Sequence, residues 1–391
     1  MAARSPPSRN SRARRRLLLA AGAAAFAPAP AVAGRAIPVG PQRALRSLAA
    51  AAAQARDGDT IEVDAGDYAG DTSVWTHDRL VIRAVGGPVR LLASGQAAEE
   101  KAIWVVRGGA IRVEGIDFIG ARVRDRNGAG IRLERGRLTL EECGFFDNEN
   151  GILTSGHQAS ELVIERCRFG GNGAGDGQSH NLYVGAIGRL SVRASWFYGA
   201  RVGHLLKSRA LTSLIAYNRF VDGDDGHASY ELEFPWGGMV RVLGNLIQQS
   251  ATTQNSTMLS FGAEGYPRPA NVLYACYNTF VDERPSGIAL RVAAGADGIL
   301  FANNLLAGNA NLLTGGQGDL RDNPRLSRNE FHDPDRHDYR LRARSPWVGR
   351  AAPHADLEAA GMVPEREYVH PARSRLLPGR PLSPGALQST A

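Results

Sequence analysis

The chain has 391 residues, and its 46 basic side chains against 39 acidic ones give a formal charge of +7. Six of the arginines and no acidic residue lie in residues 1–33, so the rest of the chain is nearly neutral, which excludes a phosphate-binding basic surface and nucleic acid as a partner. An apolar content of 43% and 46 glycines are typical of a soluble globular chain rich in turns, and exclude collagen, coiled coil and wholesale disorder.

Residues 1–33 carry the features of an export signal. Arg14-Arg15-Arg16 precedes an apolar run that begins at Leu17, and Ala31-Val32-Ala33 matches a small-x-small cleavage site. The segment resembles a twin-arginine signal peptide, which implies a periplasmic or secreted protein. The apolar run is much shorter than the ~20 residues that a membrane span needs, so we expect no membrane span after cleavage. An uncleaved transmembrane anchor is the alternative.

The next segment, residues 34–57, is predicted to be an N-terminal capping helix. Residues 43–56 are rich in alanine and leucine, which favour helix, and they run directly into Asp57-Gly58-Asp59-Thr60, a typical turn. A helix at this point would cover the open end of whatever repeat follows it.

Residues 58–350 are dominated by one repeated motif, apolar-x-apolar-x-x-(Asn/Cys/Ser)-x-(Phe/Ile/Leu). Its eight copies begin at Ile111, Leu138, Leu162, Leu190, Ser213, Val240, Leu273 and Ile299. Apolar residues two apart point to the same side of a strand, and a repeat of this length accommodates three short strands with their turns. The motif therefore predicts an all-β fold, a single-stranded right-handed parallel β-helix of about ten coils.

The bend position of the motif predicts a ladder of side-chain amides. Asn218, Asn245, Asn278 and Asn304 occupy this position in the later copies. Stacked about 4.8 Å apart, they would pass hydrogen bonds from coil to coil. Cys143 and Cys167 stand in the same column of earlier coils, and are predicted to be stacked core thiols and not a disulfide or a metal site.

These features resemble the pectate-lyase-like right-handed β-helix superfamily over about residues 40–350. Asp338-Tyr339-Arg340-Leu341 and Ser345-Pro346 resemble the last coil of that superfamily. Residues 351–391 are expected to form an extended tail along the barrel or to be partly disordered. The resemblance specifies the fold, whereas its members include lyases, hydrolases, epimerases and binding proteins.

Candidate functional residues lie on the strand that precedes each motif copy. Counting back from the bend places Asn181, His204 and Glu231 in one column, and these side chains with Tyr183 and Glu233 are expected to face outward on three adjacent coils. His180, His204 and His227 are spaced by one coil and are expected to lie along one edge, with histidines in ordinary turns as the alternative. The predicted substrate-binding residues are Asn181, His180, Glu231, Glu233 and Tyr230.

The segment from His204 to Arg209 is the strongest catalytic candidate, since Lys207 is one of only two lysines in the chain. Cleavage of a uronate polymer by β-elimination removes a proton next to a carboxylate. Arg209 would hold the carboxylate, Lys207 or His204 would take the proton, and Tyr183 would protonate the leaving oxygen. Members of the superfamily use lysine and arginine in such roles, as the resemblance implies. Strict alternation from Leu205 would turn Lys207 inward, so its role requires a break in the strand.

Other interpretations remain open at this level. Glu231 and Glu233 on one strand face would also suit acid–base hydrolysis, or the protein could be an epimerase, or a noncatalytic protein that binds glycans or assembles surface polysaccharide. No metal site is predicted with certainty, although the acidic turn with Asp222, Asp224 and Asp225 is a candidate for calcium. The expected partner is an acidic polysaccharide, and the chain is expected to be a monomer.

Overall fold

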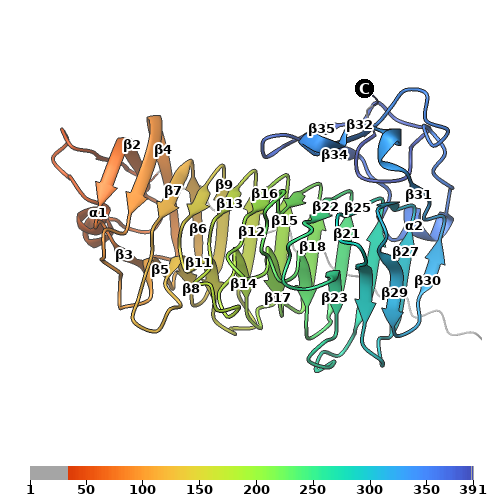
Figure 1. Cartoon of the computed structure of the whole chain (residues 1–391). Helices are drawn as coiled ribbons and strands as arrows, with labels where there is room; N and C mark the ends of the chain where they lie inside the picture. The colour runs from red at the N-terminus through yellow and green to blue at the C-terminus, as the bar shows by residue number, and fades with distance from the viewer. Residues whose placement is uncertain (1–33, 389, 391) are drawn as a thin grey trace, which may run out of the picture. The chain divides into compact units, whose positions relative to one another are not determined.

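The computed structural model describes residues 34–388 and residue 390, so the predicted signal peptide lies outside the described residues. In the described part the chain winds into a parallel β-solenoid in which every coil contributes one strand to a ten-stranded sheet (Figure 1). The strands of this sheet, in chain order, are β3 (Ser73–Trp75), β5 (Ala102–Val106), β8 (Ala129–Leu133), β11 (Asn150–Thr154), β14 (Leu182–Val184), β17 (Leu206–Ser208), β20 (Leu232–Phe234), β23 (Thr257–Phe261), β26 (Ile288–Val292) and β29 (Asn311–Gly315).

The other two strands of each coil belong to a 21-stranded sheet that opens with three strands of its own. These are β1 (Ala36–Val39), β2 (Thr60–Ala69) and β4 (Arg79–Leu92). A first series follows with β6 (Ala110–Glu114), β9 (Arg137–Glu141), β12 (Glu161–Glu165), β15 (Arg189–Arg193), β18 (Thr212–Ala216), β21 (Met239–Leu243), β24 (Val272–Cys276), β27 (Gly298–Ala302) and β30 (Asp319–Arg321). A second series comprises β7 (Ile116–Ile119), β10 (Gly144–Phe146), β13 (Arg168–Gly170), β16 (Trp196–Tyr198), β19 (Arg219–Val221), β22 (Leu246–Gln249), β25 (Thr279–Asp282), β28 (Leu305–Ala307) and β31 (Arg325–Leu326).

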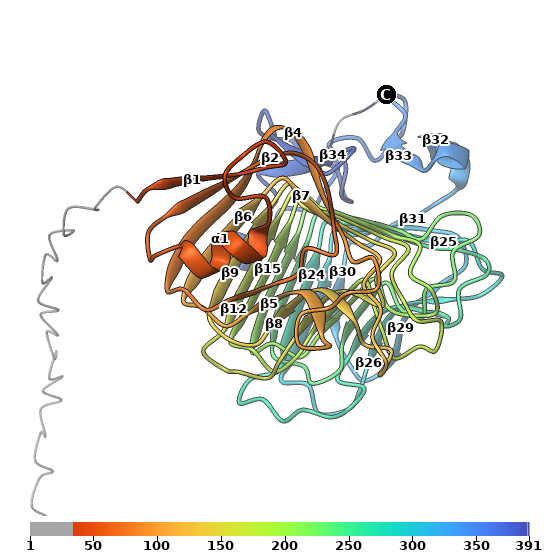
Figure 2. The ribbon, with the colours of Figure 1, turned by 90° about the vertical axis from the view of Figure 1, so that its left-hand side faces the viewer.

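The core forms where the motif predicts it. Phe118, Phe145, Phe169, Phe197 and Phe220 are fully buried and stack coil on coil with ring centroids between 4.4 and 5.1 Å apart. At the open N-terminal end, helix α1 (Leu48–Gln54) buries its Leu48 against the core, and the Ser47 side chain caps it by accepting from the Ala50 N–H (Figure 2). The predicted capping helix is therefore present, although it is shorter than residues 34–57 because β1 precedes it.

The predicted amide ladder is confirmed. Asn218 Nδ2 donates to Asn245 Oδ1 at 2.9 Å, and the same contact is 3.0 Å from Asn245 to Asn278 and 3.0 Å from Asn278 to Asn304. Asn323 continues the ladder, since it accepts from Asn304 Nδ2 at 2.9 Å. Each of these amides also donates to a carbonyl of the preceding coil, so the ladder satisfies buried backbone groups at the bend.

Replacing one rung should destabilise the solenoid. Asn245 exchanges hydrogen bonds with Asn218, Asn278 and Ile215, so Asn245→Ala leaves several buried groups without partners. At about 1–3 kcal/mol for each such group, we expect the free energy of unfolding to fall by several kcal/mol in denaturant titration. The matched control is Asn311→Ala, at an exposed position of β29, which should have little effect. Equal losses from both variants would contradict the role given to the ladder.

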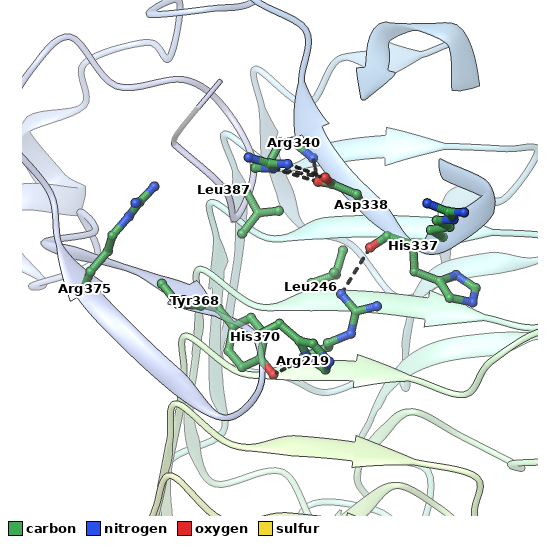
Figure 3. A pocket seen from close by; sticks show the side chains of 11 residues that line it. Arg219, Leu246, His337, Asp338, Arg340, Tyr368, His370, Arg375 and Leu387 are labelled. Carbon is green, nitrogen blue, oxygen red and sulfur yellow. Dashed lines mark hydrogen bonds and ion pairs between the residues drawn. The ribbon is translucent and has the colours of Figure 1, made fainter. Parts of the chain in front are cut away.

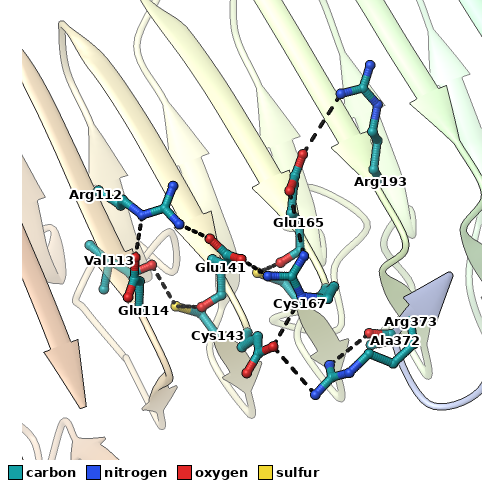
Figure 4. Close-up of polar contacts among 12 residues, drawn as sticks. Arg112, Val113, Glu114, Glu141, Cys143, Glu165, Cys167, Arg193, Ala372 and Arg373 are labelled. Atoms are coloured by element: carbon teal, nitrogen blue, oxygen red, sulfur yellow. Dashed lines mark hydrogen bonds and ion pairs between the residues drawn. The ribbon is translucent and has the colours of Figure 1, made fainter. Parts of the chain in front are cut away.

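The cysteines are free and buried, as predicted for core thiols. The Cys143 thiol donates to the Glu141 carbonyl at 3.4 Å, and the Cys167 thiol donates to the Glu165 carbonyl at 3.3 Å (Figure 4). Burial, and then the contact with Cys143, raises the pKa of the Cys167 thiol. The Cys167 thiol is therefore held in the unreactive neutral form.

The C-terminal region differs from the prediction. Asp338–Leu341 is strand β33, which pairs antiparallel with β32 (Phe331–Asp333) and not as a parallel last coil. Phe331, Tyr339 and Leu341 pack on outward apolar side chains of the second series, and this packing explains the change. The tail is also ordered: it contains α2 (Ala355–Ala359) and a hairpin of β34 (Arg366–Val369) with β35 (Arg373–Leu376), seen beside the solenoid in Figure 1.

Candidate functional site

The candidate site lies on the outward face of the ten-stranded sheet, where the strand register sets which side chains neighbour each other. Tyr183 on β14 pairs with Lys207 on β17, and Lys207 pairs with Glu233 on β20. The column starts two coils before Tyr183 with Arg132 on β8, which pairs with Leu153 on β11. The register thus places Tyr183, Lys207 and Glu233 side by side on three adjacent coils.

Lys207 faces outward because the chain bends before its strand begins. Leu205 and Leu206 are both fully buried, so the inward positions at this corner are two consecutive residues and not two alternate ones. β17 begins at Leu206 and therefore turns Lys207 to the outer face. The strand break that a catalytic role for Lys207 requires is present.

Lys207 is surrounded by carboxylates. Its Nζ lies 3.0 Å from Glu233 Oε2 and 3.5 Å from Glu264 Oε1, and the lysine side chain is 14% exposed. The charged groups nearest to Lys207 are therefore carboxylates. We call Tyr183, His204, Lys207, Arg209, Glu233 and Glu264 the Lys207 cluster.

Arg209 is held by three different contacts. It binds Glu264 through Nη2 at 2.6 Å and through Nε at 2.9 Å, and its Nη1 donates to the Tyr183 hydroxyl at 2.6 Å. Its Cζ lies 5.3 Å from the Tyr183 ring centroid and 5.4 Å from that of Trp236. A planar guanidinium between two aromatic rings, bidentate to a carboxylate, is well arranged to recognise a carboxylate in a ligand.

His204 is a buried member of the Lys207 cluster and contacts Glu233. Its Nε2 lies 2.9 Å from Glu233 Oε2, so Nε2 carries the proton and donates to the carboxylate. Burial lowers the pKa of His204, and the Glu233 contact offsets only part of this shift. Burial acts against ionisation of Glu233 too, but its contacts with His204 and Lys207 outweigh it and lower the pKa of Glu233 to about 2. An ionised Glu233 thus accepts a hydrogen bond from a neutral His204 and lies 3.0 Å from Lys207 Nζ.

Of the three histidines predicted along one edge, His180 and His204 stack on each other and His227 does not join them. The rings of His180 and His204 stack with centroids 4.3 Å apart, and Tyr230 meets His204 edge-on at 4.9 Å. Tyr230, and not His227, occupies the next position, because the turn at residues 222–227 carries His227 to an exposed place near Thr252. The expected row of three histidines is therefore wrong at its third member.

Two predicted outward residues point into the solenoid. Asn181 is fully buried, and its Oδ1 accepts from Asn172 Nδ2 at 2.7 Å, in an amide ladder that starts at Asn148. Glu231 is also fully buried, and neither of its carboxylate oxygens has a hydrogen-bond partner within the described residues. The same corner that buries Leu205 turns both side chains inward, so Glu231 and Glu233 do not share a face.

The acidic turn does not form a calcium site. Asp222 is buried, and its Oδ2 accepts from the Ala228 N–H at 2.9 Å, whereas the exposed Asp224 lies 3.4 Å from His337 Nε2. In residues 34–388, no three histidine, cysteine or acidic side chains are grouped so as to hold a metal ion. The described positions of Asp222, Asp224 and Asp225 therefore do not support the calcium candidate.

A hollow of about 500 Å³ adjoins the Lys207 cluster at Tyr183. Its walls include Arg126 and Asp176, which lie 3.5 Å apart, and its floor includes Arg132 and Leu153. Burial lowers the pKa of Arg132, and its Nε has no hydrogen-bond partner in the part of the chain described. The hollow and the cluster meet at Tyr183, and each of them holds acidic side chains beside its cations.

Two residues of this site, Arg132 and Glu264, were not predicted from the sequence. Arg132 lies in the strand Gly130-Ile131-Arg132-Leu133, which aligns with the later strands of the same sheet and could have been found by extending the alignment two coils toward the N-terminus. Glu264 lies in the loop after β23, where no periodicity marks it.

The fold is that of a pectate-lyase-like parallel β-helix protein. A crystal structure of pectate lyase Pel9A matches it with a TM-score of 0.56 over 90% of this chain and 96% of that chain, at 13% sequence identity. No protein-family model and no curated protein matches the sequence. At this identity the match establishes the fold alone. Among the described residues, no helix has the length and apolar character to cross a membrane.

Proposed function

We propose that this protein is an exported polysaccharide lyase that cleaves a uronate-containing glycan by β-elimination. The observation that carries the proposal is the contact set of Arg209, whose guanidinium binds the Glu264 carboxylate at its outer side and the Tyr183 hydroxyl at its inner side. Glu264 is the most exposed member of its ion pairs, at 39%, and it stands where the carboxylate of a uronate would bind.

The reaction follows from this placement. A substrate carboxylate displaces Glu264 and is neutralised by Arg209, which acidifies the adjacent C5 proton. Lys207 Nζ, held by Glu233, accepts that proton in its neutral form. The C4–O bond then breaks as the C4–C5 double bond forms, and Tyr183, polarised by Arg209, gives its proton to the leaving oxygen. His204 is a positioning residue, since it fixes Glu233 and both of its ring nitrogens are buried or bonded.

The rival chemistry on this fold is less well supported. Hydrolysis by two carboxylates requires both on the substrate face, and Glu231 is inside the solenoid. A noncatalytic glycan-binding protein needs the hollow and Arg209 but no proton acceptor. Export through the twin-arginine-like segment stays part of the proposal, because residues 1–33 are outside the described residues.

The test incubates the mature protein with polygalacturonate, alginate and a glucuronate-containing polymer. The ultraviolet absorbance of the unsaturated product reports cleavage. We expect the absorbance to rise with at least one of them, because β-elimination leaves a C4–C5 double bond conjugated with the carboxylate. New reducing ends without this absorbance would instead indicate hydrolysis. Binding without any cleavage would overturn the lyase in favour of the noncatalytic protein.

A further inference from the structure

A second cavity lies on a different face of the solenoid, between the second series of strands and the C-terminal segments. Trp196, Arg219 and Leu246 are neighbours in one outward column of this series. The tail hairpin covers the column, and His370 packs edge-on against Trp196 with centroids 4.5 Å apart. A pocket of about 400 Å³ remains over Arg219 (Figure 3), which falls in the range of small-molecule sites, about 300–1,000 Å³. We call it the Arg219 pocket.

Arg219 is a cation without a counterion at the floor of this pocket. Its Nη1 donates to the His337 carbonyl at 3.1 Å, and its Nε is buried without a partner. Within residues 34–388 it takes part in no ion pair with a carboxylate. Burial lowers the pKa of Arg219, and the nearby Tyr368 offsets only part of this effect. A desolvated and unpaired guanidinium is costly, so its presence at a cavity floor calls for an anion.

The acidic residues around the pocket are already neutralised. Asp338 binds Arg340 through Nε at 2.9 Å, and Glu367 binds Arg375 through Nη2 at 2.6 Å. The remaining wall cation, Arg336, is mostly exposed and lies 3.9 Å from Asp333. Within residues 34–388, the charge at Arg219 is thus left without a carboxylate that balances it.

The rest of the lining is uncharged and largely apolar. Leu246, Val369 and Leu387 contribute aliphatic surface, and Tyr368 contributes a ring. His370 also lines the pocket, and burial followed by the charge of Arg219 lowers its pKa, which favours the neutral imidazole. Such a lining accepts the body of an organic molecule behind its charged group.

We propose that the Arg219 pocket binds one small organic anion, with a carboxylate or phosphate group on Arg219 and a ring-sized body against Leu246, Tyr368 and Leu387. This site lies on the second series of the 21-stranded sheet, apart from the Lys207 cluster on the ten-stranded sheet. The proposal therefore does not depend on the lyase activity.

Calorimetric titration of the mature protein with D-galacturonate, benzoate and glucose 1-phosphate tests the proposal and separates the sugar, aromatic and phosphate sources. We expect at least one of them to bind, and Arg219→Gln to weaken that binding by about tenfold or more through loss of the charge-assisted hydrogen bonds. Neutral D-galactose serves as the ligand control. The protein control is Arg189→Gln, an exposed arginine on β15.

Two further variants make the result unambiguous. Leu387→Trp fills the cavity and leaves Arg219 in place, so it should abolish binding even if Arg219→Gln disturbs the docking of the tail. Lys101→Met should bind the same anion as the wild type, because Lys101 belongs neither to the Arg219 pocket nor to the Lys207 cluster. No binding of any anion by the wild type, or wild-type affinity in both Arg219→Gln and Leu387→Trp, would overturn the proposal.

Discussion

Lys207→Met should reduce the turnover number of uronate cleavage by about 10²–10⁴-fold, the usual contribution of a positioned general base. Methionine keeps most of the length of the side chain but cannot accept a proton. Arg209 and the hollow at Tyr183 are unchanged, so KM should move little, and the loss should appear in kcat. Initial rates from the ultraviolet absorbance of the unsaturated product measure both constants.

The chain provides a matched control in its only other lysine. Lys101 also lies between two glutamates, with Nζ 3.1 Å from Glu99 and 2.8 Å from Glu134, but it precedes β5, three strands away from Tyr183 on β14 in the ten-stranded sheet. Lys101→Met removes the same charge from a similar pair of carboxylates and should leave kcat unchanged. Wild-type kcat in Lys207→Met, or equal losses in both variants, would remove Lys207 from the reaction.

The repeat was predictable because its positions are set by local and periodic constraints. Burial at every second residue and the amide at the bend recur in each coil, so a single motif reveals the phenylalanine stack and the ladder from Asn218 to Asn304. The same reasoning identified Tyr183, His204, Lys207 and Arg209, which the register does bring together.

The remaining errors come from corners and loops, where alternation fails. Asn181, Leu205 and Glu231 stand one residue before their strands, and the bend turns them inward beside the next apolar residue. A count in steps of two cannot detect two consecutive inward positions. Glu264 and the tail belong to segments with no period at all, and their places depend on tertiary contacts such as the Arg209–Glu264 ion pair.

Because the Glu231 side chain points inward, the solenoid has a carboxyl group in its interior. Asp222 and Asp282 are the nearest acidic groups, and they stand two coils apart in one column with Gln249 between them. Burial, and then the charge of Asp222, raises the pKa of Glu231 well above its ordinary value, while burial raises the pKa of Asp222 to about 6. Glu231 is thus protonated in the folded protein under conditions in which it would be ionised in the unfolded chain.

This difference makes stability fall as the pH rises. Above the ordinary glutamate pKa of about 4.3, the folded protein holds a proton on Glu231 that the unfolded chain has lost. Each pH unit in that window lowers the free energy of unfolding by about 1.4 kcal/mol for that proton. Asp222 adds the same effect between about pH 4 and its folded pKa of about 6. For each of the two groups, the stabilising contribution is fully present below the pKa that the group has in the unfolded chain. It is lost as the pH rises to the pKa that the group has in the folded protein.

Glu231→Gln replaces the carboxyl group with a neutral amide of the same shape, so the variant should be more stable than the wild type at pH 8, and the difference should shrink toward pH 5. Denaturant unfolding of both proteins at several pH values isolates the contribution of Glu231, because all other titrating groups are shared. Glu233→Gln is the control two residues away: its carboxylate has a pKa of about 2, so its loss should destabilise the protein at pH 8 as well as at pH 5. Parallel stability curves for the wild type and Glu231→Gln would show that the interior carboxyl group ionises in the folded protein as it does in the unfolded chain.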